Sequence, residues 1–95
     1  NSSNEMLLVS SAKMLSDIEM QNNNFKSAIT LIKDTKKKVN LASLKNLLDL
    51  DEARLLIQSG SFDDARAKLN SILDLKDISN NQKQTAEQML GQISS

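Results

Sequence analysis

No proline and only two glycines, Gly60 and Gly91, occur in this chain of 95 residues. Turns between β-strands depend on glycine, proline and asparagine at fixed positions, so the sequence offers few sites for a β-sheet to turn. Its apolar side chains are mainly Leu, Ile, Ala and Met, and they recur every three or four residues, as on one face of an α-helix. We therefore predict an all-α protein, and the length suits one domain over residues 1–95.

The apolar spacing predicts about five helices separated by short polar stretches. We expect them at about 3–21, 24–39, 41–59, 62–75 and 79–94. The third is the most apolar, with leucine or isoleucine around more than half of its circumference. We therefore expect it at the centre of the fold.

Polar side chains at the predicted helix starts are suited to accept the free N–H groups of a first turn. The predicted capping residues are Ser2 with Glu5, Asn24, Asn40, Ser61 with Asp64, and Ser79 with Gln82. Gly60 is placed to end the third helix in the left-handed conformation that glycine adopts freely. The side chains that we expect inside on the other helices are Leu8, Ala12, Leu15 and Ile18; Phe25, Ala28, Ile29 and Ile32; Phe62, Ala65, Leu69 and Ile72; and Ala86, Met89, Leu90 and Ile93.

A local pattern recurs at an offset of 37 residues. Residues 23–29 read NNFKSAI and residues 60–66 read GSFDDAR, so a turn residue, a cap, an aromatic and an alanine match in order. This pattern resembles the junction between the two helices of a tetratricopeptide repeat. In that family the aromatic packs on the first helix and the alanine lets the helices cross closely. On this resemblance we expect Phe25 and Phe62 to be buried at equivalent positions.

The resemblance implies a short right-handed solenoid of stacked antiparallel hairpins. The first repeat spans about 5–39, the second about 41–76, and 79–94 is either a capping helix or the start of a third repeat. Leu90-Gly91 resembles the leucine–glycine pair of a repeat's first helix, whereas the proline that ends a standard repeat is missing. Tetratricopeptide-like domains bind other proteins, so the resemblance implies a scaffold for a peptide or an amphipathic helix.

Within that class, residues 47–56 (LLDLDEARLL) and 60–65 (GSFDDA) are similar to the bacterial YfgM-like family. Its members are single-pass inner-membrane proteins with a periplasmic repeat domain, which assist the Sec translocon and periplasmic chaperones. The resemblance implies the periplasmic side of a bacterial inner membrane, with translocon or chaperone components as partners; the alternative is the cytoplasm. The chain begins with asparagine, so we expect a domain excised from a longer protein.

Residue types that carry chemistry are scarce. The chain has no histidine, cysteine, tyrosine or tryptophan. The usual proton shuttles, thiol nucleophiles and imidazole metal ligands are therefore missing, and we predict no enzyme activity, cofactor or metal. Asp49, Asp51 and Glu52 suggest paired carboxylates or a calcium site, but side chains this close on a helix point in different directions. We expect them to form a solvated helix face.

Charge and hydropathy narrow the possible partners. Twelve basic and twelve acidic residues cancel, so the chain lacks the positive field on which nucleic-acid binding depends. No apolar stretch reaches the roughly 20 residues of a membrane span. We therefore expect a protein partner.

The concave side of the expected solenoid is where we predict that this partner binds. The predicted partner-binding residues are Lys13, Asp17, Met20, Leu47, Leu50, Arg54 and Ile57. Three of them are large aliphatic side chains, which we expect a partner to cover, and Arg54 is expected to pair with a carboxylate or carbonyl of that partner. The alternative is a self-association module, in which the apolar face of the third helix pairs two copies as a homodimer.

Overall fold

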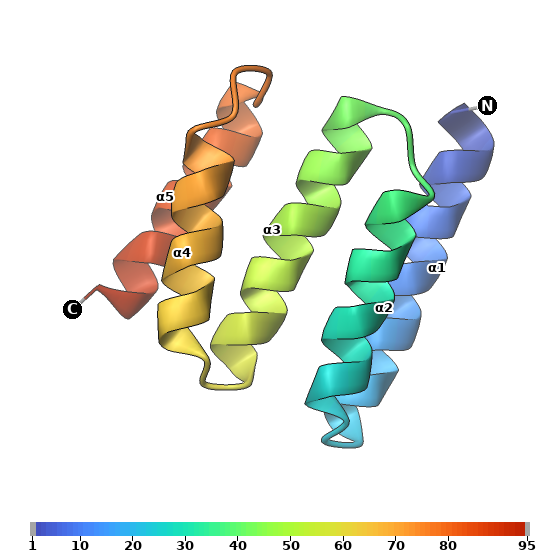
Figure 1. The fold of residues 1–95 in the computed structure, drawn as a ribbon, viewed down its shortest axis with the longest axis horizontal. Helices are drawn as coiled ribbons and strands as arrows, with labels where there is room; N and C mark the ends of the chain where they lie inside the picture. The colour runs from blue at the N-terminus through green and yellow to red at the C-terminus, as the bar shows by residue number, and fades with distance from the viewer. Residues whose placement is uncertain (1, 95) are drawn as a thin grey trace.

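The computed structural model describes residues 2–94, which form five helices and contain no strand (Figure 1). The helices are α1 (Ser2–Gln21), α2 (Phe25–Lys37), α3 (Ala42–Gln58), α4 (Phe62–Leu73) and α5 (Asn80–Ile93). The predicted all-α class is therefore confirmed.

Consecutive helices run antiparallel and pack side by side, with α3 in the middle (Figure 1). The α1–α2 pair lies on one side of α3 and the α4–α5 pair on the other. The molecule is flat, with extents of 41 × 35 × 17 Å. Both α1 and α5 also contact α3, but among the described residues they do not pack against each other.

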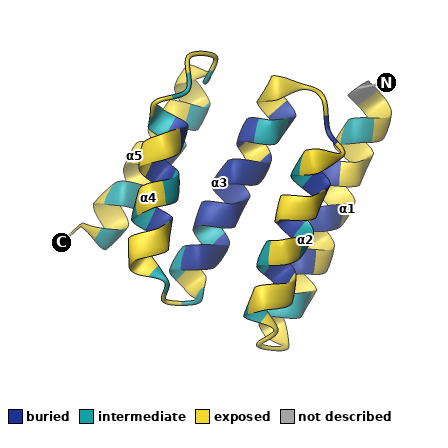
Figure 2. Cartoon of the chain, viewed as in Figure 1, coloured by how far each residue is buried: buried dark blue, intermediate teal, exposed yellow. Residues whose placement is uncertain are grey.

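The core consists of two apolar clusters that share α3. The first joins α1, α2 and α3 through Val9, Ala12, Ala28, Ile32, Val39, Leu44, Leu48 and Leu55. The second joins α3, α4 and α5 through Leu50, Ala53, Leu69, Ile72 and Ala86. Ten of the 17 residues of α3 are buried, which makes it the darkest ribbon in Figure 2. The prediction that this helix is central is confirmed.

The turns after α1 and after α3 repeat each other in detail. Asn23 and Gly60, which are 37 residues apart, both have a positive φ, of 62° and 82°. In each turn the next backbone N–H donates to the carbonyl five residues earlier, at 2.8 Å. Ala28 and Ala65, also 37 residues apart, are both fully buried. The sequence offset therefore marks two equivalent helix–turn–helix junctions.

The inner face of α1 differs from the prediction. Three of its four predicted inside residues are on the surface, namely Leu8 (36% exposed), Leu15 (53%) and Ile18 (49%). Ala12 is buried as expected, but its neighbours in the core are Val9 and Ser16. Ala12 and Ser16 put small side chains on the buried face of α1, and small side chains at a contact allow packed helices to approach closely.

The two phenylalanines are also less buried than predicted. Phe62 is 49% exposed and Phe25 is half-buried. Each is the first residue of its helix and lies beside the preceding turn, at the end of the helix pair instead of between the helices. The equivalence of their positions holds, but the expected burial is wrong.

The predicted caps are confirmed only in part. Asn24 and Ser61 are the N-cap residues of α2 and α4 as predicted, but they make no capping hydrogen bond through their side chains, and Leu41 stands where Asn40 was expected as the cap of α3. Only Ser79 with Gln82 forms a capping box. The predicted box at the start of α1 involves the side chain at position 2, which lies outside the described part of the chain.

Glu5 has a different function from the predicted cap. Its Oε1 accepts hydrogen bonds from the backbone N–H groups of Leu41, at 3.1 Å, and Asn40, at 3.0 Å. These bonds, the one from Leu41 first, lower the pKa of Glu5 despite the opposing effect of burial. The start of α1 is thereby tied to the connection between α2 and α3.

Candidate functional site

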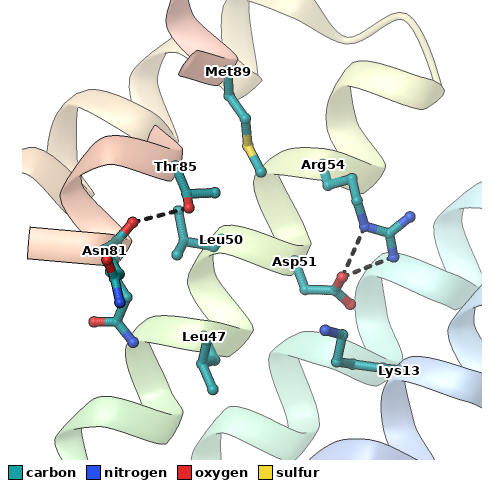
Figure 3. A pocket seen from close by; sticks show the side chains of 9 residues that line it. Lys13, Leu47, Leu50, Asp51, Arg54, Asn81, Thr85 and Met89 are labelled. Carbon is teal, nitrogen blue, oxygen red and sulfur yellow. Dashed lines mark hydrogen bonds and ion pairs between the residues drawn. The ribbon is translucent and has the colours of Figure 1, made fainter. Parts of the chain in front are cut away.

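Two adjoining hollows lie along α3, and Arg54 lines both. The first hollow, of about 250 Å³, lies between α1, α3 and α5 (Figure 3). Its lining residues are Lys13, Leu47, Leu50, Asp51, Arg54, Asn81, Gln82, Thr85 and Met89. The second hollow, of about 420 Å³, is lined by Asp17, Met20, Gln21, Phe25, Arg54 and Gln58. We call the two hollows together the groove.

Six of the seven predicted partner-binding residues line the groove. The seventh, Ile57, is partly buried and packs against the second core cluster. Leu50 lines the groove but is only 6% exposed, so it belongs to the core. Of the three aliphatic residues expected to be uncovered, only Leu47 is open, at 40% exposed. The other two belong to or pack against the second core cluster, so they are covered by α4 and α5 of this chain.

The position of α5 is fixed partly by Gln82, which sequence reasoning noted only as a cap. Its Nε2 donates to the carbonyl of Ser43 at 3.1 Å, and its Oε1 accepts from Nδ2 of Asn46 at 3.5 Å. These contacts hold the start of α5 against the first half of α3. The groove wall formed by Asn81, Thr85 and Met89 follows from that attachment.

Arg54, which we expect to pair with a carboxylate or carbonyl of a partner, already pairs with two carboxylates inside the molecule. Its Nη2 donates to Asp17 Oδ1 at 2.8 Å and to Asp51 Oδ1 at 2.7 Å, and its Nε also donates to Asp51. Burial of the guanidinium acts to lower the pKa of Arg54, but the hydrogen bonds to the two carboxylates outweigh it and raise that pKa. Arg54 therefore ties α1 to α3 across the groove.

Asp51 places a buried carboxylate in the wall of the first hollow. Its side chain lines the hollow and the residue is only 5% exposed. Arg54 uses Oδ1, whereas Oδ2 has no hydrogen-bond partner. The carboxylate therefore contributes a negative charge to the wall of the hollow, which favours a ligand with an ammonium or N–H donor over one with a carboxylate. Lys13 of α1 lines the same hollow.

The acidic residues of α3 are buried, not solvated as we expected. Asp49 and Glu52 are each 6% exposed. Lys36 of α2 lies 2.7 Å from Asp49 Oδ1, and Lys68 of α4 lies 3.0 Å from the same oxygen and 3.4 Å from Glu52 Oε1. This charge network joins three helices. It has a structural role that sequence reasoning could have found, because acidic side chains on a central helix must meet basic ones on its neighbours.

The network perturbs the ammonium at its centre. Burial acts to lower the pKa of Lys68, but the hydrogen bond to Asp49 and the charges of Asp49 and Glu52 outweigh it and raise that pKa. Within residues 2–94 no group of three or more acidic side chains is arranged to hold a metal ion. The arrangement is therefore an ion-pair network.

The α3 face expected to pair two copies is inside the molecule. Both sides of α3 are filled, one by the α1–α2 pair and the other by the α4–α5 pair (Figure 2). Leu47 of α3 and Leu41, which precedes the helix, are the large apolar residues here that are substantially exposed. A homodimer would have to use another surface.

Comparison with known proteins finds no match: no family model, no curated protein and no solved structure resembles the chain significantly. None of the helices in the described part of the chain has the length and apolar character needed to cross a membrane. Function must therefore be inferred from the groove and from the surfaces of the helices.

Proposed function

We propose that the chain is a non-enzymatic protein–protein interaction scaffold that holds a segment of another protein in the groove. The observation that carries this proposal is the first hollow, between α1, α3 and α5. At about 250 Å³ it is smaller than the roughly 300–1,000 Å³ of small-molecule sites, and its size suits one or two side chains of a partner. The scaffold needs no cofactor.

The lining of this hollow sets the chemistry of the segment. Leu47, Leu50 and Met89 provide an aliphatic wall, and the carboxylate of Asp51 provides a negative charge. The segment that fits has an aliphatic side chain next to an N–H or ammonium donor. A peptide ending in several carboxylates does not fit, because Asp51 and the nearby Asp17 would repel it.

We further propose that the chain is a tetratricopeptide-like domain. It would belong either to a YfgM-like protein on the periplasmic side of a bacterial inner membrane or to a cytoplasmic protein. The support is the recurrence of the turn and the buried alanine at an offset of 37 residues. On this proposal the partners are translocon or chaperone components, whereas nucleic acid is not a partner because the chain has no net charge.

Peptide selection tests the proposal. A displayed library of random peptides about 12 residues long would be selected on the 95-residue chain. Two variants serve as matched targets: Leu47→Arg fills the hollow from an exposed position, and Asn70→Arg adds the same charge on α4, outside the groove. Circular dichroism establishes that both variants remain folded.

We expect selected peptides to lose at least about tenfold in affinity on Leu47→Arg and less than about twofold on Asn70→Arg. The selected peptides should also share an aliphatic side chain next to a residue that carries an ammonium or N–H donor. Peptides that bind both variants as well as the parent chain would show that the groove is not the binding site.

A further inference from the structure

The outer face of α1 carries an apolar stripe that nothing in the molecule covers. Five large side chains on this face are exposed: Leu7 (68%), Leu8 (36%), Met14 (68%), Leu15 (53%) and Ile18 (49%). Ser11 lies among them at the middle of the helix. With about 3.6 residues per turn these six positions lie on one side of α1, opposite its buried residues Val9, Ala12 and Ser16. We call the six residues the α1 stripe.

The stripe is large and contains no charged residue. Monomers rarely expose a continuous apolar patch beyond roughly 300–600 Å², and five aliphatic side chains exposed by a third to two thirds reach that scale. α1 has 20 residues, so the stripe follows a helix about 30 Å long. Lys13 and Asp17 of α1 line the groove, which leaves the stripe available separately.

We propose that the α1 stripe binds the same stripe of a second copy, with the two helices antiparallel and the twofold axis at Ser11. In this register Leu7 faces Leu15 of the second copy, and Leu8 faces Met14 of the second copy. The small Ser11 lies at the crossing point, where it lets the helices approach closely. The surface is thus complementary to itself, as a twofold interface requires.

The shape of the stripe matches this register. A shallow hollow of about 360 Å³, lined by Asn4, Leu7, Leu8 and Ser11, occupies its N-terminal half. The side chains of its C-terminal half, Met14, Leu15 and Ile18, are exposed by 49–68%. An antiparallel pair places the C-terminal half of each copy over the hollow of the other.

Charge also favours the antiparallel pair. Glu19 lies near the C-terminal end of α1, at one margin of the stripe. A parallel pair would bring the two Glu19 carboxylates to the same end of the interface and align the helix dipoles, whereas an antiparallel pair places the carboxylates at opposite ends and opposes the dipoles. The stripe has no charged residue that could select a partner of opposite charge. A second copy presents the same uncharged apolar surface, which matches it.

The area indicates a weak, reversible dimer. Two stripes together would bury on the order of 1,000 Å², near the lower limit for a specific interface. We therefore expect the dimer to form in the micromolar to millimolar range and to depend on chain concentration. The groove stays open in this dimer, so the inference does not depend on the function proposed above.

Analytical ultracentrifugation from about 10 μM to about 1 mM tests the dimer. The parent chain should rise from the 10.5 kDa of one chain towards twice that mass. Leu15→Lys should raise the midpoint concentration at least about tenfold, whereas Met6→Lys should change it less than about threefold. Met6 is the matched control because it is 58% exposed on the same helix but lies off the stripe. A mass of 10.5 kDa at all concentrations, or equal shifts from both variants, would overturn the proposal.

Single cysteines test the register, because the chain has no cysteine of its own. Position 11 meets itself across the proposed axis, so Ser11→Cys should form a disulfide-linked dimer on mild oxidation. Position 18 faces position 4 of the second copy, so Ile18→Cys should link far more slowly. Linking of both at the same rate would indicate a parallel pair and contradict the proposed register.

Discussion

Buried charged residues connect the helices, although the sequence predicted that the acidic ones would be solvated. Lys68 reaches Asp49 and Glu52 of α3 from α4, and Lys36 reaches Asp49 from α2. Removing one partner of a buried pair leaves the other charge without compensation, which is usually costly. Here Lys36 remains beside Asp49 and the Lys68 side chain is 22% exposed, so both features reduce that cost.

For Lys68→Met we predict a loss of about 1–3 kcal/mol in the free energy of unfolding, because Glu52 loses its nearest cation. Urea denaturation measures it. Lys76→Met is the control: Lys76 is exposed outside the helices, and its replacement should cost less than about 0.5 kcal/mol. Equal values for the two variants would mean that the network does not stabilise the fold.

The carboxylate of Glu5 gives a prediction that depends on pH. Its pKa is lowered from 4.5, so its contribution is present above that value and is lost as pH falls through the lowered pKa. At neutral pH Glu5→Gln should therefore be less stable than the parent chain. The difference between the two should shrink as the pH is lowered from about 6 to about 3. Urea denaturation along this series is the measurement, and a constant difference would refute the assigned bonds to Asn40 and Leu41.

Among the helices, the sequence pattern was most reliable where the decisive interactions are local. Five helices and the left-handed turn at Gly60 follow from spacing and from glycine's conformational freedom. The inner face of α1 could not be predicted in the same way, because this helix has apolar residues on two opposite faces. Which face is buried depends on how closely α2 can approach, and Ala12 and Ser16 decide that in three dimensions. The burial of Leu50 likewise depends on α5, which is distant in sequence.

The two glycines should respond oppositely to replacement by alanine. Gly60 has a φ of 82°, so Gly60→Ala should cost about 1 kcal/mol. Gly91 lies inside α5, and a Cβ there meets nothing within 4 Å. Gly91→Ala should therefore stabilise the chain by up to about 1 kcal/mol through helix propensity. The midpoint of thermal unfolding should fall for Gly60→Ala and rise for Gly91→Ala. Changes of the same sign in the two variants would contradict the assigned turn.

Leu50 and Leu47 provide a matched test of how α5 packs on α3. Leu50 is 6% exposed and belongs to the second core cluster, whereas Leu47 is 40% exposed. We expect Leu50→Ala to cost about 2–5 kcal/mol and Leu47→Ala less than about 1.5 kcal/mol, measured by urea denaturation. If Leu50→Ala is as mild as Leu47→Ala, α5 does not cover this part of α3.

At the scale of the whole molecule, the flat arrangement separates two surfaces that share α1. The groove uses Lys13, Asp17 and Met20, and the α1 stripe uses the opposite margin of the helix. Six of the seven predicted partner-binding residues line the groove. The contribution of α5 was not predicted, since its place depends on contacts such as that of Gln82 with Ser43.

The central claim is that the groove receives a segment of a partner protein. Nuclear magnetic resonance of the 95-residue chain, titrated with the tightest peptide from the displayed library, tests it most directly. We predict that the largest amide shifts occur at Leu47, Asp51, Thr85 and Met89, which line the first hollow. Leu47→Arg should abolish these shifts, while Leu15→Lys on the α1 stripe should leave them unchanged. Shifts centred on the α1 stripe, or spread evenly over all five helices, would contradict the claim.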